Sequence, residues 1–148
     1  MKPGLFRFFI NLYPPYLGAG VCIASIAPDW SEMVVDLKLR FYNRNYMGTH
    51  YGGNLFTMTD PFYMLMLIHR LGPEYRVWDQ RAEITYKKPG RGRVRATMRV
   101  TEEQIDAIRA ATADGAKHLP RFHVEIIDEE GDVVATVEKT LYVRRRAA

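Results

Sequence analysis

The stretch that decides the fold covers residues 54–71 and reads NLFTMTDPFYMLMLIHRL. Apolar side chains occur on every side of a helix drawn through it, and such a helix is typically surrounded by other structure. Two starts are open: Asp60 caps the helix with Pro61 in its first turn, or the helix begins near Gly53 and bends at Pro61. Either way, the sequence predicts one central helix inside the rest of the chain.

Strand patterns lie on both sides of this helix. Apolar and polar side chains alternate over residues 33–41, which predicts a strand with one wet face. They alternate again over residues 81–87 and 93–100, and a Pro89-Gly90 turn between these two predicts a hairpin. The remaining strands are expected at residues 20–26, 122–128 and 132–144.

Two peripheral helices complete the expected elements. Residues 3–12 are predicted to form a short amphipathic helix that docks on the body of the protein. A capping box that begins at Thr101 and ends at Gln104 predicts another short helix near residues 102–113. Sequential hairpins favour an antiparallel sheet, so the fold class is α+β, with about six strands wrapped around one long helix. We expect a single domain over residues 1–148 with its core at 18–146.

Composition excludes several classes of protein. The chain has 148 residues, a formal net charge of +4 and one cysteine, so an internal disulfide is impossible and a reducing, cytoplasmic compartment is expected. Its most apolar stretch contains Asp60, His69 and Arg70, and we therefore expect no membrane span. The basic residues form no dense stripe, which disfavours nucleic acid as a partner.

The loop before the central helix carries a recognisable motif. The pattern Asn-x-x-Gly-Thr-x-His-Gly-Gly, with an aspartate seven residues after its second glycine, is matched in register by Asn45, Gly48, Thr49, Gly52, Gly53 and Asp60. The chain thereby resembles the hotdog-fold thioesterase superfamily, of the phenylacetyl-CoA thioesterase type, and within it a bacterial branch of unassigned function. At the position of the family's histidine this chain has Tyr51, and His50 stands one residue earlier.

The resemblance implies a hotdog fold that hydrolyses an acyl-CoA thioester to a carboxylic acid and free coenzyme A. Asp60 would act as general base or nucleophile, and Asn45 would orient water or that carboxylate. Gly52 and Gly53 would let backbone N–H groups at a helix N-terminus approach the carbonyl and stabilise its developing negative charge. Structural alternatives remain open: Asp60 as a helix cap, Asn45 as a turn residue, and the glycines as a tight turn.

Other residues are expected to contact the substrate. Thr49, His50 and Tyr51 are expected beside the glycines, where His50 or Tyr51 could line a pocket or cap loop backbone. Lys88 and Arg91, at the tip of a basic turn, are candidates for the phosphates of coenzyme A, or else belong to a solvated turn. The histidines lack ligand spacing, so no metal is expected, and no cofactor is expected apart from coenzyme A as part of the substrate.

The resemblance further implies a homodimer or homotetramer with sites shared between chains. Two functions remain open at this point. The register of Asn45, Gly53 and Asp60 favours a thioesterase. Tyr51 in place of the family's histidine favours a non-catalytic module that binds an acyl group, acyl-CoA or a fatty acid.

Overall fold

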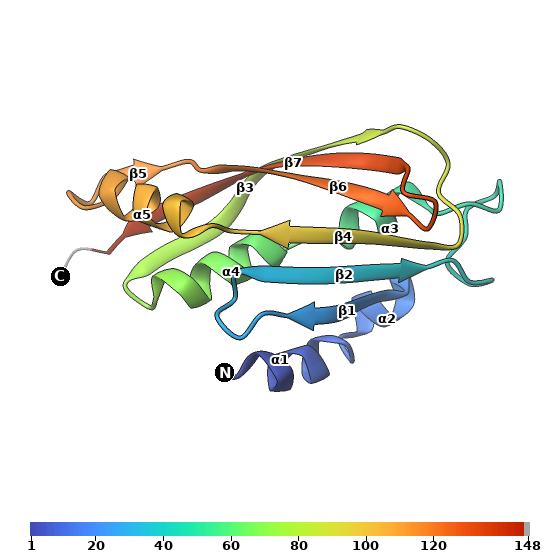
Figure 1. The fold of residues 1–148 in the computed structure, drawn as a ribbon, viewed down its shortest axis with the longest axis horizontal. Coiled ribbons are helices and arrows are strands. Elements are labelled where there is room, and N and C mark those ends of the chain that lie inside the picture. Colours follow the sequence, from blue (N-terminus) through green and yellow to red (C-terminus); the bar gives the residue numbers. More distant parts are fainter. Residues whose placement is uncertain (147–148) are drawn as a thin grey trace.

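The computed structural model describes residues 1–146, which form an antiparallel sheet with helices on one face and along one edge (Figure 1). The helices are α1 (Pro3–Ile10), α2 (Pro14–Ala19), α3 (Gly52–Thr57), α4 (Phe62–Leu71) and α5 (Glu102–Ala111). The strands are β1 (Val21–Ile26), β2 (Glu32–Lys38), β3 (Tyr75–Tyr86), β4 (Arg93–Arg99), β5 (Lys117–His118), β6 (Arg121–Asp128) and β7 (Val133–Arg145). The α+β class and the hotdog arrangement are therefore confirmed.

The sheet has seven strands, one more than expected, because the two-residue β5 pairs with the end of β7. The other six follow the order β1-β2-β4-β6-β7-β3. The predicted hairpin between residues 81–87 and 93–100 is wrong: β3 pairs with β7, while β4 lies between β2 and β6. The Pro89-Gly90 segment reverses the chain, but it carries the chain from the β3 edge of the sheet to the interior position of β4. The prediction failed because alternation of apolar and polar residues does not specify which strand is the partner.

The central helix is present as two consecutive helices, α3 and α4, separated by residues 58–61. The helix begins at Gly52 and is interrupted before a cis Asp60–Pro61 peptide bond. Of the two starts left open, the one near Gly53 is therefore observed, and Asp60 does not cap α4, because Pro61 occupies the N-cap position without a side-chain cap. Nor is α4 enclosed on every side by this chain, since Ile68 remains 39% exposed.

The core lies between α4 and the inner face of the sheet. Phe62, Met66 and Leu67 of α4 are fully buried, as are Met98 of β4 and Val137 of β7. The inner face is built from alternate residues of each strand, as period-2 patterning requires. β2 ends at Lys38, short of the predicted boundary at residue 41, and Phe41 is exposed.

The N-terminal segment forms two helices where one was predicted. α1 docks through Phe6, whose ring centroid lies 5.2 Å from that of Trp30. Pro14 and Pro15 do not end the helical segment but open α2, because the first turn of a helix needs no N–H donors there. The capping box of α5 is confirmed: Thr101 Oγ1 accepts from the backbone N–H of Gln104.

Candidate functional site

The loop before α3 is held by Asn45. Its Oδ1 accepts the backbone N–H groups of Met47 and Thr49, each at 3.0 Å. Its Nδ2 donates to Thr49 Oγ1 at 2.9 Å and to the His50 carbonyl at 3.2 Å. Asparagine commonly stabilises tight loops in this way. The hydrogen bonds of Asn45 are thus spent within the loop itself.

His50 joins this loop to the basic turn at residues 87–93. Its backbone N–H donates to the Gly90 carbonyl at 2.9 Å, and its ring Nε2 donates to the Gly92 carbonyl at 2.8 Å. The residue is 4% exposed, and burial lowers the pKa of its imidazole. Since a carbonyl only accepts, Nε2 carries the proton, and the buried Nδ1 has no partner among the described residues. The neutral ring therefore has one unsatisfied hydrogen-bond acceptor, Nδ1.

A cavity of about 580 Å³ lies between the two loops that His50 connects. Apolar contributions to its wall come from Met47, Leu55 and Pro89. The predicted site residues that line it are Asn45, Thr49, His50, Gly52, Lys88 and Arg91. Gly53, Tyr51 and Asp60 are not among its lining residues. Residues from two segments distant in sequence therefore meet here, but without the predicted catalytic carboxylate.

A side chain on either glycine in the first turn of α3 would require a neighbouring tyrosine side chain to move. A Cβ on Gly52 would lie 2.8 Å from the hydroxyl oxygen of Tyr86, and one on Gly53 would lie 2.6 Å from the ring of Tyr51. Tyr51 is the N-cap residue and is 56% exposed. The backbone N–H groups of Gly52 and Gly53 have no partner among residues 1–146. The close approach of these two tyrosine side chains explains why glycine occupies both positions. The two N–H groups remain free to donate hydrogen bonds to a ligand.

Asp60 is paired with a buried lysine that the sequence analysis did not assign to the site. Lys139 Nζ lies 2.6 Å from Asp60 Oδ1 and 3.4 Å from Asp79 Oδ1. The side chain of Lys139 is 1% exposed, while that of Asp60 is 46% exposed. The ammonium also lies 5.3 Å from the ring centroid of Phe56. One oxygen of Asp60 thus faces a desolvated cation, and the carboxylate as a whole remains open to solvent.

The second carboxylate and a tyrosine complete this network. Burial, together with the charge of Asp60, raises the pKa of Asp79, against the opposing effect of Lys139. The hydroxyl of Tyr16 donates to the Asp60 backbone carbonyl at 2.7 Å. Burial raises the pKa of that hydroxyl well above its ordinary value. α2 and β7 therefore contact Asp60 directly, and β3 joins the network through the contact of Asp79 with Lys139.

A signal for Lys139 exists in the sequence. Along β7, Val137, Leu141 and Val143 point inward, and Lys139 has the same parity. A lysine on the inward face of an apolar strand needs a buried counter-charge, because an isolated buried ammonium is strongly disfavoured. That parity predicts an internal carboxylate partner without naming it.

The basic turn is partly neutralised by the turn between β6 and β7. Lys88 Nζ lies 2.7 Å from Asp128 and 2.6 Å from Asp132, and these carboxylates raise the pKa of the ammonium well above its ordinary value. Asp128, Glu130 and Asp132 bring their oxygens within 4.8 Å of one another, but Lys88 already supplies the positive charge there. Arg91 is exposed and has no ion-pair partner among the described residues.

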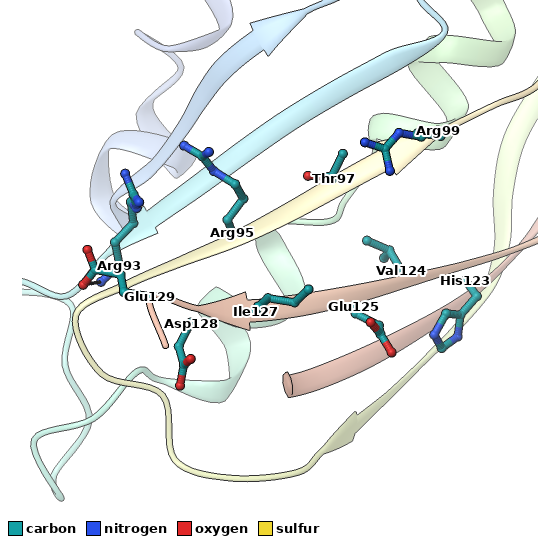
Figure 2. Close-up of a pocket in the computed structure, with 10 residues that line it drawn as sticks. All are labelled: Arg93, Arg95, Thr97, Arg99, His123, Val124, Glu125, Ile127, Asp128 and Glu129. Atoms are coloured by element: carbon teal, nitrogen blue, oxygen red, sulfur yellow. Dashed lines mark hydrogen bonds between the residues drawn. The ribbon is translucent and has the colours of Figure 1, made fainter. Parts of the chain in front are cut away.

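A second hollow, of about 520 Å³, lies on the outer face of the sheet and contains none of the predicted residues (Figure 2). β4 and β6 pair over only three residues each and then diverge, which opens it. Arg95 binds both carboxylate oxygens of Asp36, at 2.7 and 2.9 Å, and Arg99 binds Glu32 at 2.6 Å. Most of the guanidinium groups that line this hollow are therefore already paired with carboxylates.

Solved structures share this fold along nearly the whole chain. A Pseudomonas aeruginosa protein of unknown function, described as a probable thioesterase, superposes with a TM-score of 0.84 at 18% identity, covering 97% of this chain and 95% of that one. Mouse thioesterase superfamily member 2 gives 0.67 at 17% identity, with 95% and 96% covered. A variant of the phenylacetic acid degradation protein of Thermus thermophilus gives 0.60 at 24% identity, with 90% and 99% covered.

These likenesses show the class of fold: the protein has the hotdog fold that these solved structures share. Within that class, the chain belongs to the family described as a domain of unknown function, DUF4442, whose model matches residues 4–143. No curated protein matches the sequence significantly. Among residues 1–146, no helix is long and apolar enough to cross a membrane.

Proposed function

We propose that the protein hydrolyses acyl-CoA thioesters, with Asp60 as general base or nucleophile. The observation that carries the proposal is the contact of the half-exposed Asp60 with the fully buried Lys139 at 2.6 Å. The buried ammonium holds one oxygen of this half-exposed carboxylate in place, and a carboxylate oxygen can accept a proton from water or attack a carbonyl carbon.

The chemistry needs few groups. As general base, Asp60 takes a proton from water while the water oxygen attacks the thioester carbonyl. The N–H groups of Gly52 and Gly53 stabilise the resulting oxyanion, a contribution of about 3 kcal/mol for one donor. The tetrahedral intermediate then expels the coenzyme A thiolate, which takes up the proton. Lys139 is a positioning residue here: it holds Oδ1 and leaves Oδ2 to react.

The site is shared between chains in this proposal, because one chain separates the cavity from Asp60. β3 is the outermost strand of the sheet beyond β7, with an edge that can pair with another copy. Ile68 of α4 is also left partly exposed. A homodimer or homotetramer with two sites per dimer would bring Asp60 of one chain toward the glycines of the other.

The substrate follows from the cavity. Its apolar wall suits an acyl group, and the exposed Arg91, with Lys88 held beside it, suits the phosphates of coenzyme A. A protein of this kind would act in the cytoplasm. It would need no metal, cofactor or nucleic acid.

Thiol release from a panel of acyl-CoA substrates tests the proposal. Asp60→Asn should lower kcat/KM at least about 100-fold, the usual size of a general-base contribution. Asp106→Asn, an exposed change on α5, should leave it unaltered. If Asp60→Asn retains wild-type turnover, the assigned residue is wrong, and turnover of no acyl-CoA by the folded wild type would reject the hydrolase.

A mixed dimer tests the shared site. A heterodimer of an Asp60→Asn chain and a Gly53→Pro chain should regain about one wild-type site, because both lesions fall in the same site and the other site is intact. If each site belonged to one chain, both sites would carry a lesion and no activity would return.

The second candidate function is a non-catalytic acyl-binding module. It is favoured by Tyr51, whose ring lies against the Cβ position of Gly53, and by Asn45, whose hydrogen bonds are spent inside the loop. Native mass spectrometry separates the two candidates: a binding module retains an acyl ligand and releases no thiol, whereas an enzyme turns it over.

A further inference from the structure

The outward face of the two N-terminal helices is apolar. It consists of residues that are each 49–61% exposed, and we call it the N-terminal apolar face: Leu5, Phe8, Phe9, Leu12, Tyr13 and Leu17. Leu5, Phe8 and Phe9 share one side of α1 through their spacing of three and four, Leu12 and Tyr13 lie in the turn that follows, and Leu17 lies on α2. The inward side packs independently through Phe6, Ile10 and Tyr16. The docking of α1 and α2 on the body therefore does not require the outward face to be apolar.

Two sequence segments that adjoin this face carry basic residues and no acidic ones. Residues 1–28 contain no aspartate or glutamate, and their charged residues are Lys2 and Arg7, both exposed. Residues 37–59 likewise contain no acidic residue but include three exposed cations: Lys38, Arg40 and Arg44. Basic residues alone therefore occur in both segments.

The two segments meet at the end of α2. Asn43 Nδ2 donates to the Ala19 carbonyl and to the Lys38 carbonyl, each at 2.9 Å. Phe41, 84% exposed, stands beside Arg40 in the same loop. Aromatic and aliphatic side chains are thus bordered by cations along α1, α2 and the loop after β2.

We propose that the N-terminal apolar face docks on an anionic phospholipid bilayer, with α1 and α2 lying in the plane of its surface. Phe8, Phe9 and Leu12 enter the boundary between headgroups and acyl chains, while Lys2 and Arg40 contact lipid phosphates. A second copy of the chain would bring the same positive charges against this face, whereas an anionic surface complements both its apolar and its charged parts.

The place of the face in the fold is compatible with this arrangement. α1 and α2 lie along β1, at the opposite edge of the sheet from β3 (Figure 1). Docking at the β1 edge leaves the β3 edge and the cavity beside Pro89 uncovered. The proposal stands apart from the proposed hydrolysis, because its readout is lipid binding.

Co-sedimentation of the full chain with vesicles tests the proposal. The wild type should bind vesicles of phosphatidylcholine with phosphatidylglycerol, bind phosphatidylcholine alone more weakly, and be released in part by added salt. Phe8→Ser combined with Phe9→Ser should lower the partition coefficient at least about tenfold. Leu119→Ser is the matched control, since it removes an apolar side chain 38% exposed at the other end of the sheet.

Charge reversal tests the electrostatic part. Lys2→Glu with Arg40→Glu should weaken binding to anionic vesicles and leave binding to neutral vesicles unchanged, whereas Lys117→Glu should alter neither. Hydrogen exchange of the wild type supplies a readout without any substitution: vesicles should protect amides in residues 3–17 and leave those of β3 unprotected.

Failure of the wild type to bind either vesicle would overturn the proposal. Equal binding by the wild type and the Phe8→Ser, Phe9→Ser variant would do the same. If sedimentation velocity shows that this variant dissociates a larger assembly while the wild type ignores vesicles, a second copy covers the face and the membrane is rejected.

Discussion

Replacing Lys139 by methionine should destabilise the protein in a manner that depends on pH. The substitution keeps an unbranched apolar stem in a site that is 1% exposed and removes the ammonium. Two carboxylates then face each other without a cation. Their oxygens lie at most about 6 Å apart, because both are within 3.4 Å of the same nitrogen.

The magnitude follows from that distance. At an effective dielectric constant of about 20, two unit charges about 6 Å apart repel by about 3 kcal/mol. Breaking a buried ion pair typically costs about 3–5 kcal/mol. Asp60 is 46% exposed, so water screens part of both effects. We expect Lys139→Met to lower the free energy of unfolding by about 2–3 kcal/mol at pH 7.

Urea unfolding followed by tryptophan fluorescence across pH measures this loss. Burial raises the pKa of Asp79, so protonation of this carboxyl removes the repulsion as pH falls, and the loss should shrink to below about 1 kcal/mol near pH 4. Leu141→Met, two residues along the same face of β7, is the matched control and should cost less than about 1.5 kcal/mol at every pH. Adding Asp60→Asn to Lys139→Met should recover part of the stability.

A loss that stays constant between pH 4 and pH 8 would refute the reasoning, because simple packing defects do not titrate. Strict additivity of Lys139→Met and Asp60→Asn would also refute it. Both results would mean that the lysine and the aspartate do not interact in solution.

Three further predictions concern neighbouring residues. Burial raises the pKa of Asp79, so the ionised carboxylate lowers the stability of the folded protein as pH rises above about 4. Asp79→Asn should therefore be more stable than the wild type over that range, and a stability gain that does not grow with pH would contradict the prediction. Burial lowers the pKa of His50, so the wild type should lose stability as pH falls below about 6.5, and His50→Gln should flatten that slope in the same urea series. Gly53→Ala should change the free energy of unfolding by less than about 1 kcal/mol, because the exposed Tyr51 ring can rotate away. The same substitution should lower kcat/KM roughly 10- to 100-fold in the thiol-release assay, and unchanged turnover would remove Gly53 from the site.

Local patterns predicted most of the fold. The capping box at Thr101 and the alternation in β2 and β7 identified their elements, because helix caps and period-2 burial are encoded within a few residues. The pairing of β3 with β7 was missed, since the paired residues lie 49 to 70 positions apart in the sequence. The second N-terminal helix, α2, was missed because proline at a helix start and proline in a loop look alike in sequence.

In the candidate site, too, residues close in sequence were predicted together and contacts between distant residues were not. Asn45, Thr49, His50 and Gly52 are neighbours in sequence, and a local motif was enough to bring them to one cavity. The second wall of that cavity, from Tyr86 to Arg91, was anticipated only as a basic turn. Its contact with His50 Nε2 comes from tertiary packing, so no motif could contain it.

The motif identified Asp60 but not its ion-pair partner Lys139, and this pairing bears directly on the proposed function. The two residues are 79 positions apart, and the cation comes from the inward face of β7, where an apolar residue would otherwise stand. A buried ammonium lowers stability unless carboxylates compensate it, so a core selected only for stability would favour a hydrophobic side chain there. The lysine lies against the single carboxylate that the motif marks, and that carboxylate is half exposed. We therefore expect Lys139→Met to lower kcat in the thiol-release assay while KM stays near its wild-type value, because the carboxylate is no longer held in place. Leu141→Met should leave both constants unaltered, and an unchanged kcat in Lys139→Met would reduce the lysine to a structural role.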